Sequence, residues 1–166
     1  KNDTVIAIID NGVDINHTDL QGHLWQNTAE KNGTSGVDDD SNGYTDDIFG
    51  YDFATNVADP NHKYPAGGSI GNSHGSHVAG LTAAVTNNGA GVAGVMASKA
   101  KIMALNVFGN SNGAATSNID NAIRYAADMG AKVINMSLGG PGATSSTQRA
   151  IEYAVSKGTF VVVAAG

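Results

Sequence analysis

The sequence predicts an α/β fold in which a central parallel β-sheet carries helices on its faces. Short continuous apolar runs, rich in β-branched residues, recur along the chain, as expected for strands that are covered on both faces. Segments with helical spacing of apolar residues lie between these runs. Strands that alternate with helices of this length imply right-handed βαβ units, and such units build parallel sheets.

The expected elements alternate along most of the chain. Strands are predicted at residues 5–9, 102–107, 133–136 and 160–165, and helices at residues 77–85, 119–129 and 146–156. Gly130 and Gly158 follow the last two helical patterns, at positions where a glycine ends a helix. Residues 21–72 are different, because they are rich in Gly, Asn, Asp and Ser and show almost no periodicity. We expect a long loop region there, which needs its own stabilisation.

Composition excludes several classes of function. The 166 residues contain 9 Lys and Arg against 15 Asp and Glu, a formal charge of −6, and the basic residues do not cluster. We therefore expect neither a nucleic-acid partner nor an anionic membrane surface. No apolar run approaches the roughly 20 residues of a membrane helix. The absence of cysteine removes disulfides, thiol nucleophiles and thiolate metal sites.

Polar and small residues follow the apolar runs at four points. Ligands of parallel α/β sheets bind at the carboxyl ends of strands, which meet at one rim of the sheet. That rule selects Asp10 together with residues 106–109, 137–140 and 164–166. The sequence therefore predicts a binding site to which these segments contribute.

Asp10 and His74 are the candidate catalytic residues. Asp10 ends a buried strand, where a carboxylate is partly desolvated and needs a partner, although an ordinary turn residue fits the same position. His74 stands at a loop-to-helix junction, where one ring nitrogen can bond a carboxylate while the other faces a nucleophile. A purely structural histidine fits that position as well.

Four blocks of sequence stand out in a definite order. They are Ile8-Ile9-Asp10-Asn11-Gly12-Val13-Asp14 with His17-Thr18-Asp19-Leu20, then His74-Gly75-Ser76-His77-Val78-Ala79-Gly80, then Asn135-Met136-Ser137-Leu138-Gly139-Gly140, and finally Val163-Ala164-Ala165-Gly166. Together they resemble the subtilisin-like serine proteases, the subtilases of peptidase family S8. The resemblance implies a subtilisin-like three-layer fold with helices on both faces of the sheet. It makes residues 1–166 the N-terminal portion of a single catalytic domain, incomplete at the C-terminus, with an acidic calcium-loop insertion at about 21–72.

The resemblance also implies catalytic roles. Asp10 matches the aspartate that holds the histidine in its tautomer, and His74 matches the general base. His77 matches a histidine that is not catalytic, and we expect it to turn into the helix packing. The implied function is a serine endopeptidase that hydrolyses peptide bonds in proteins through an Asp-His-Ser triad.

A polypeptide substrate is implied by the same resemblance. An extended peptide would lie as a β-strand between two edges of the protein. The expected substrate-binding residues are Phe108, Asn112, Gly113, Ser137, Leu138, Gly139, Ala164, Ala165 and Gly166. Phe108 and Leu138 would line apolar subsites of that groove.

The family's nucleophilic serine is expected outside this chain. In the family, Ala-Ala-Gly continues into an asparagine that donates to the oxyanion and much later into a Gly-Thr-Ser motif, whereas this sequence stops at Gly166. We therefore expect a C-terminal segment of the same protein as a partner, in the same chain or a cleaved one. An inhibitory propeptide is a further candidate partner. The alternative is a catalytically inactive subtilase fragment or pseudoprotease that binds peptides.

Residues 38–47 form a candidate calcium loop. The sequence Asp-Asp-Asp-Ser-Asn-Gly-Tyr-Thr-Asp-Asp follows the EF-hand pattern through nine positions. The expected ligands are Asp38, Asp40, Asn42, the Tyr44 carbonyl and Asp46. Phe49 occupies the twelfth position in place of the bidentate glutamate, for which Asp47 could compensate. The alternative is a solvated acidic loop, in which the carboxylates would repel one another.

A second calcium site is implied by the family resemblance alone. It would use Asp19, Asn88 and the carbonyl groups of Val85, Ala90 and Val92. The absence of cysteine leaves the redox compartment undecided, because calcium can stabilise a secreted protein in place of disulfides. A secreted, extracellular enzyme is what the family resemblance implies.

Two other functions fit isolated motifs. A metallohydrolase could use Asp10, His74 and His77, since histidines three residues apart can share a metal ion. Residues 89–94 fit the G-x-G-x-x-G pattern of dinucleotide binding. That pattern requires a strand followed by a helix, whereas these residues follow an expected helix and precede an expected strand.

Overall fold

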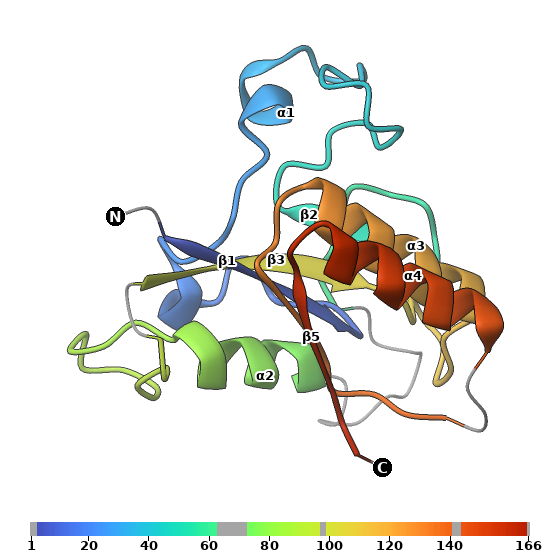
Figure 1. Cartoon of the computed structure of the whole chain (residues 1–166). Coiled ribbons are helices and arrows are strands. Elements are labelled where there is room, and N and C mark those ends of the chain that lie inside the picture. The colour runs from blue at the N-terminus through green and yellow to red at the C-terminus, as the bar shows by residue number, and fades with distance from the viewer. Residues whose placement is uncertain (1–2, 63–72, 97–98, 141–143, 166) are drawn as a thin grey trace.

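The sheet contains five parallel strands in the order β2-β3-β1-β4-β5 (Figure 1). In this computed structural model, residues 3–62, 73–96, 99–140 and 144–165 are described. The strands are β1 (Thr4–Asp10), β2 (Gly50–Asp52), β3 (Ala100–Asn106), β4 (Val133–Met136) and β5 (Phe160–Val163). β1 therefore lies in the middle of the sheet, and the predicted parallel α/β fold is confirmed.

Helices cover both faces of the sheet, which gives three layers (Figure 1). The helices are α2 (His74–Ala83) on one face, and α3 (Thr116–Asp128) with α4 (Ser145–Ser156) on the other. Ile9 of β1 packs in the same core as Ile123 of α3, whereas Ile8 packs in the core that contains Ala79 of α2. Successive side chains of a strand point to opposite faces, so β1 contributes to both cores.

The helices begin earlier than the sequence predicts. α2 begins at His74 and not at residue 77, and α3 begins at Thr116 and not at residue 119. Apolar spacing marks the turns that face the core, whereas the first turn of each of these helices lacks apolar residues. The pattern therefore misses the turn that holds His74.

Residues 21–62, the described part of the expected loop region, lie mostly outside helices and strands, but they are not without regular structure. They contain the short helix α1 (Thr28–Asn32) and the edge strand β2, and the 3-10 helix η1 (Thr18–Leu20) ends just before them. β2 pairs with β3 through only three residues. A strand that short cannot display a two-residue period, so hydrophobic alternation gives no sign of it.

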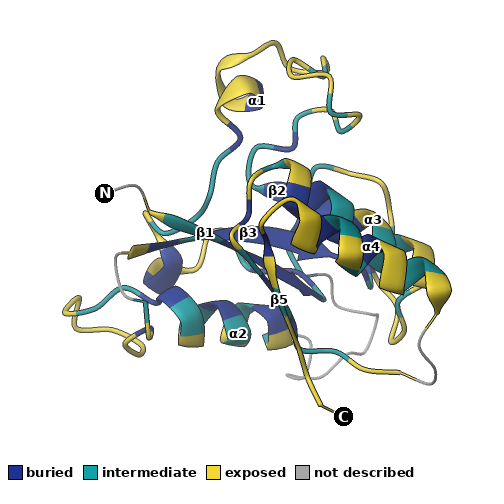
Figure 2. Ribbon diagram, viewed as in Figure 1, coloured by how far each residue is buried: buried dark blue, intermediate teal, exposed yellow. Residues whose placement is uncertain are grey.

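β5 forms the other edge of the sheet, and its side chains are largely uncovered (Figure 2). Phe160 is 69% exposed and Val163 is 50% exposed. A continuous apolar run is typical of a strand that is buried on both faces. β5 therefore presents an apolar surface that no described residue covers.

No helix in the described ranges has both the length and the apolar character needed to cross a lipid bilayer.

Candidate active site

Asp10 and His74 meet at the carboxyl end of β1. Asp10 is the last residue of β1, and His74 is the first residue of α2. His74 Nδ1 lies 2.8 Å from Asp10 Oδ1 and 2.9 Å from Asp10 Oδ2. An ionised carboxylate can only accept hydrogen bonds, so Nδ1 carries the proton in this pair. Nε2 of the neutral imidazole is then left as a proton acceptor.

The two side chains differ strongly in their exposure to solvent. The Asp10 side chain is 4% exposed, whereas that of His74 is 48% exposed. The backbone N–H of Asn11 donates to Asp10 Oδ1 at 2.8 Å and so helps to fix the carboxylate. Among the described residues, the His74 ring has hydrogen bonds to Asp10 and none to a serine.

Gly75 allows α2 to pack directly on the end of β1. A Cβ atom at Gly75 would lie 2.2 Å from the carbonyl oxygen of Gly12 and 3.1 Å from the Cβ of Asp10. The nearest contact is backbone, which cannot move aside as the end of a flexible side chain can. A larger residue here would therefore push His74 away from Asp10.

A cleft of about 300 Å³ opens beside Asp10 and His74. Its lining residues are Asp10, Asn11, His74, Phe108, Ser111, Asn112, Ser137, Leu138 and Gly139. The structure thus brings Phe108 and Asn112, which follow β3, together with residues 137–139, which follow β4. Adjacent parallel strands end at the same rim, which explains this convergence.

The remaining predicted substrate-binding residues have other positions. Gly113, Ala164 and Ala165 do not line this cleft. Gly166 lies outside the described residues. Asn11 and Ser111 line the cleft although sequence reasoning did not select them. Each adjoins a selected residue, so widening the selected segments by one residue would have found both.

Asn106 fixes the side of the cleft that contains Phe108. It is fully buried at the end of β3, and its Oδ1 accepts the backbone N–H groups of Phe108 and Gly109, each at 3.0 Å. Its Nδ2 donates to the Asn61 carbonyl at 3.3 Å and to Asp52 Oδ2 at 3.5 Å. A buried amide with partners for both ends holds the turn after β3 in one conformation.

Glu30, Asp38 and Asp40 form a cluster that could hold a metal ion. One ligand oxygen from each lies within 4.8 Å of the others. Asp38 and Asp40 both accept the backbone N–H of Asn42 at 3.1 Å, so alternate residues turn toward one point, as in an EF-hand loop. Sequence reasoning missed Glu30, because this residue belongs to α1 and lies outside the motif.

Asn42 and Asp46 make hydrogen bonds within the same loop. Asn42 Oδ1 accepts the backbone N–H of Tyr44 at 2.7 Å, and Asp46 Oδ2 accepts that of Gly36 at 2.9 Å. Such side-chain-to-backbone bonds are typical of tight turns, and they give this loop a defined shape.

Asp47 anchors the loop to α3. It is fully buried, and its carboxylate accepts hydrogen bonds from the amides of Asn27 and Asn42 and from the Tyr125 hydroxyl. Burial raises the pKa of Asp47 above its usual range and raises that of Tyr125 as well. Three donors already occupy the Asp47 carboxylate, so a metal ion would have to compete with them.

Asp19 lies against the loop that follows α2. Its carboxylate accepts the backbone N–H of Val92 at 2.9 Å and the Asn88 amide at 2.8 Å, and these two bonds lower its pKa. The cavity within this loop measures about 320 Å³, and its lining includes Val85, Asn88, Ala90 and Val92. An ionised carboxylate beside a loop of carbonyl groups is a donor set that calcium accepts.

His77 is exposed, which contradicts the prediction that it packs within the helix layer. α2 buries Gly75, Ala79 and Ala83. At 3.6 residues per turn, His77 lies about 200° around the helix from Gly75, on the opposite side. Among the described residues, no metal-binding group combines Asp10, His74 and His77. The geometry therefore does not favour the metallohydrolase.

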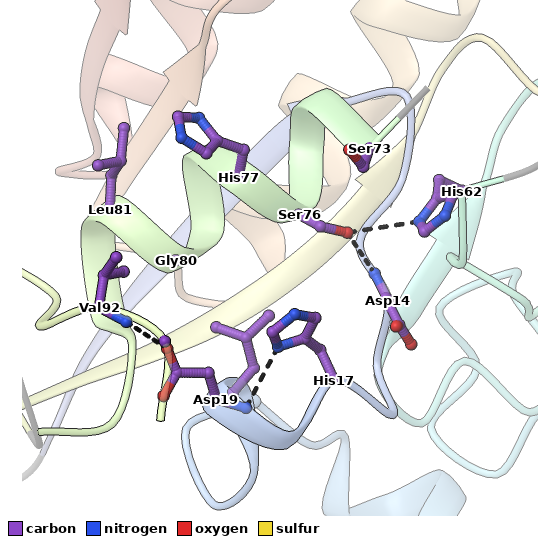
Figure 3. Close-up of a pocket in the computed structure, with 12 residues that line it drawn as sticks. Asp14, His17, Asp19, His62, Ser73, Ser76, His77, Gly80, Leu81 and Val92 are labelled. Carbon is purple, nitrogen blue, oxygen red and sulfur yellow. Dashed lines mark hydrogen bonds between the residues drawn. The ribbon is translucent and has the colours of Figure 1, made fainter. Parts of the chain in front are cut away.

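His77 instead lines a second cavity, of about 380 Å³, between α2, η1 and the loop before β3 (Figure 3). Ser76 Oγ accepts the backbone N–H of Asp14 at 2.8 Å and lies 3.4 Å from His62 Nδ1. Leu81 also lines this cavity and is 52% exposed. The polar side chain of Ser76 is thus bonded to other residues of this cavity wall, whereas the apolar side chain of Leu81 is exposed to solvent.

Known proteins are similar to this chain in sequence and in fold. The sequence profile described as the Subtilase family matches residues 1–166. Thermitase from Thermoactinomyces vulgaris is 42% identical over 161 residues, which are 97% of this chain and 46% of thermitase. The halolysin-like extracellular serine protease Nep from Natrialba magadii is 38% identical over 164 residues, which are 99% of this chain and 26% of that protein. The solved structure of the S41 psychrophilic protease has a TM-score of 0.73 and 30% identity, covering 99% of this chain and 46% of that one.

The chain spans less than half the length of these curated relatives. The profile match nevertheless extends across the whole chain and includes the strand that ends at Asp10 and the helix that begins at His74. By both sequence and fold, the chain belongs to the subtilase family of serine peptidases.

Proposed function

We propose that this chain supplies the aspartate and histidine of a calcium-stabilised serine endopeptidase. The observation that carries the proposal is the hydrogen bond from His74 Nδ1 to Asp10 at the head of a cleft. Asp10 keeps the proton on Nδ1 and stabilises the imidazolium that forms when Nε2 takes a second proton.

The nucleophile in this proposal is a serine from outside residues 1–166. As its hydroxyl oxygen attacks the peptide carbonyl carbon, its proton passes to His74 Nε2. His74 then gives that proton to the leaving amine, and the C–N bond breaks to leave an acyl-enzyme. Water, deprotonated by the same imidazole, hydrolyses the ester and restores the serine.

The substrate in this proposal is a polypeptide that lies extended across the cleft. Residues 137–139 would pair with its backbone on one side, and Asn112 and Gly113 would face it on the other. Phe108 and Leu138 are half-buried, so each offers part of its apolar surface to substrate side chains. Residues 164–166 follow β5 and would extend the wall that begins at Ser137.

A further segment of the same protein, in the same chain or a cleaved one, would bring the serine and pack on the uncovered apolar surface. The exposed side chains of Phe160, Val163 and Leu81 support this partner. Gly80 supports it too, because a Cβ atom there would have nothing within 4 Å. Glycine in a helix interior costs about 1 kcal/mol relative to alanine. A segment that approaches α2 closely would explain its presence.

Fluorophosphonate labelling of the full-length protein tests this function. The reagent reacts with a serine that a histidine base has activated. We expect one label, on a peptide outside residues 1–166, and none in the His74→Ala variant or the heat-unfolded protein. A label on Ser111 or Ser137 would place the nucleophile in this chain instead. A folded protein that takes no label would favour a peptide-binding pseudoprotease.

Calcium in this proposal has a structural role. Glu30, Asp38 and Asp40 would supply carboxylate oxygens at the acidic loop, with further oxygens from residues 42–46. A second ion would bind between Asp19 and residues 85–92. The convergence of three carboxylates supports the first site, since a bound cation would relieve their mutual repulsion.

Replacing Asp38 by alanine is expected to remove the stabilisation that calcium gives at the acidic loop, while the site at Asp19 is left intact. At a calcium concentration about 100 times the Kd, binding contributes about 2.7 kcal/mol, which raises the Tm by about 5 to 10 °C. Thermal unfolding of the full-length protein with calcium and with excess chelator measures this difference. In the control Glu152→Ala, an exposed carboxylate on α4, the difference should persist. The same difference in Asp38→Ala as in the wild type would argue against calcium at this loop.

Secretion is the localisation we infer. A relative that covers nearly the whole chain is named as an extracellular serine protease. The chain contains no cysteine, so calcium would provide the stabilisation that disulfides give many secreted proteins.

A further inference from the structure

We propose that Asn11 is a positioning residue that holds His74 against Asp10. The inference rests on the proposed function, because it concerns the same pair of residues. Asn11 is half-buried and lines the cleft directly after Asp10. In this proposal Asn11 does not act on the substrate. It acts through its hydrogen bonds to Asp10 and to Gly75.

Asn11 contacts both sides of the catalytic pair. Its backbone N–H donates to Asp10 Oδ1 at 2.8 Å. Its side-chain Oδ1 accepts the backbone N–H of Gly75, the residue after His74, at 2.9 Å. One residue thus fixes the carboxylate with its backbone and the start of α2 with its side chain.

The bond to Gly75 takes the place of a local helix cap. The first N–H groups of an α-helix have no partner within the helix. Ser73 precedes α2, yet its side chain makes no capping hydrogen bond. Asn11, 64 residues earlier than Gly75, provides the acceptor instead. A cap from within the loop would stabilise α2 alone, whereas this cap also ties α2 to the end of β1.

The contact also explains why the site needs both Asn11 and Gly75. A Cβ atom at Gly75 would lie 3.2 Å from Asn11 Oδ1 and 2.2 Å from the Gly12 carbonyl oxygen. The missing side chain therefore allows the acceptor to reach the N–H group. Without the acceptor, the first turn of α2 would lose its hydrogen bond to the residue that directly follows Asp10, and the bond from the Asp14 N–H to Ser76 Oγ would remain further along the segment.

Steady-state kinetics of the full-length protein on a short chromogenic peptide tests this role. Rates are measured across pH, well below the melting temperature of each variant. Asn11→Ala removes the acceptor, and we expect kcat to fall by about 10- to 100-fold with KM within about twofold, as for a small misplacement of a catalytic group. Asn16→Ala is the matched control, because this exposed asparagine follows in the same segment. We expect it to keep wild-type kinetics.

Asn11→Asp separates positioning from a general loss of structure. It keeps an acceptor oxygen in place, so we expect kcat at alkaline pH to return close to the wild-type value. Its added negative charge stabilises the His74 imidazolium, so the acid limb of kcat/KM should move to higher pH. A structural defect alone would produce neither the recovery nor this shift.

Two results would overturn the inference. Wild-type kcat in Asn11→Ala would mean that the Gly75 contact does not position His74. Equal losses in Asn11→Ala and Asn11→Asp would mean that the acceptor oxygen is not what matters. His74→Ala, measured in parallel, keeps the two claims apart: if it retains turnover, the proposed function falls, and the inference falls with it.

Discussion

Replacing His74 by alanine is expected to lower kcat of the full-length protein by about 10⁶-fold, the loss seen when a triad that acts as one unit loses its base. Asp10 cannot take over the role, because its side chain is only 4% exposed. KM should change little, since the side chains that flank the substrate remain. Measurement of kcat and KM, with circular dichroism to confirm the fold, checks this result.

His77→Ala is the informative comparison for that experiment. His77 lies one turn further along the same helix and is exposed, yet the structure gives it no place beside Asp10. We expect its loss of activity to stay within about tenfold. Turnover close to the wild type in His74→Ala would contradict the general-base role. Equal large losses in both variants, with recovery by zinc and not by calcium, would favour the metallohydrolase.

Apolar runs in the sequence decided which strands could be predicted. β1 and β3 are covered on both sides, so each appears in the sequence as an apolar run, and β5 shows such a run although its own side chains are largely uncovered. β2 could not be predicted, because its three residues are held by pairing with β3 and not by any pattern of their own. Propensity and periodicity describe local preferences, whereas an edge strand this short depends on its neighbour.

The rim at which Asp10 lies could be located from sequence because its position follows from topology. Asp10 ends a strand, and the carboxyl ends of parallel strands share one rim. The supporting contacts could not be predicted in this way. Asn11 bonds the backbone of Gly75, 64 residues away, and no local pattern records which N–H group an amide will meet. Glu30 could not be predicted for the same reason. Its carboxylate accepts the backbone N–H groups of Asp39 and Asp46, which lie in the acidic loop after α1.

The position of His77 could have been predicted from residues already in view. Gly75, Ala79 and Ala83 recur every four residues, which is the spacing of one helix face. Small residues in such a row indicate close packing against a sheet, and His77 does not belong to that row. The small residues, and not the family resemblance, indicate which face of α2 packs on the sheet.

Replacing Asp10 by asparagine is expected to lower kcat by about 10⁴-fold, although the shape of the side chain is almost unchanged. The Asn11 N–H already donates to Oδ1, so the amide oxygen of the variant would settle there. The amide NH₂ group would then occupy the Oδ2 position, 2.9 Å from His74 Nδ1, and would donate to it. His74 would be forced to carry its proton on Nε2, where it cannot act as a base.

Asp14→Asn is the matched control for this substitution, because Asp14 lies four residues further along the same segment and its Oδ1 accepts the Asn16 N–H at 3.0 Å. An asparagine oxygen can accept that bond equally well, so its kcat should match the wild type. Fluorophosphonate labelling rates should follow kcat in both variants, since the same base activates the serine. Similar small losses in Asp10→Asn and Asp14→Asn would mean that His74 does not depend on Asp10 for its tautomer. The proposed triad requires that dependence, because a neutral amide can neither hold the proton on Nδ1 nor balance the charge of the imidazolium.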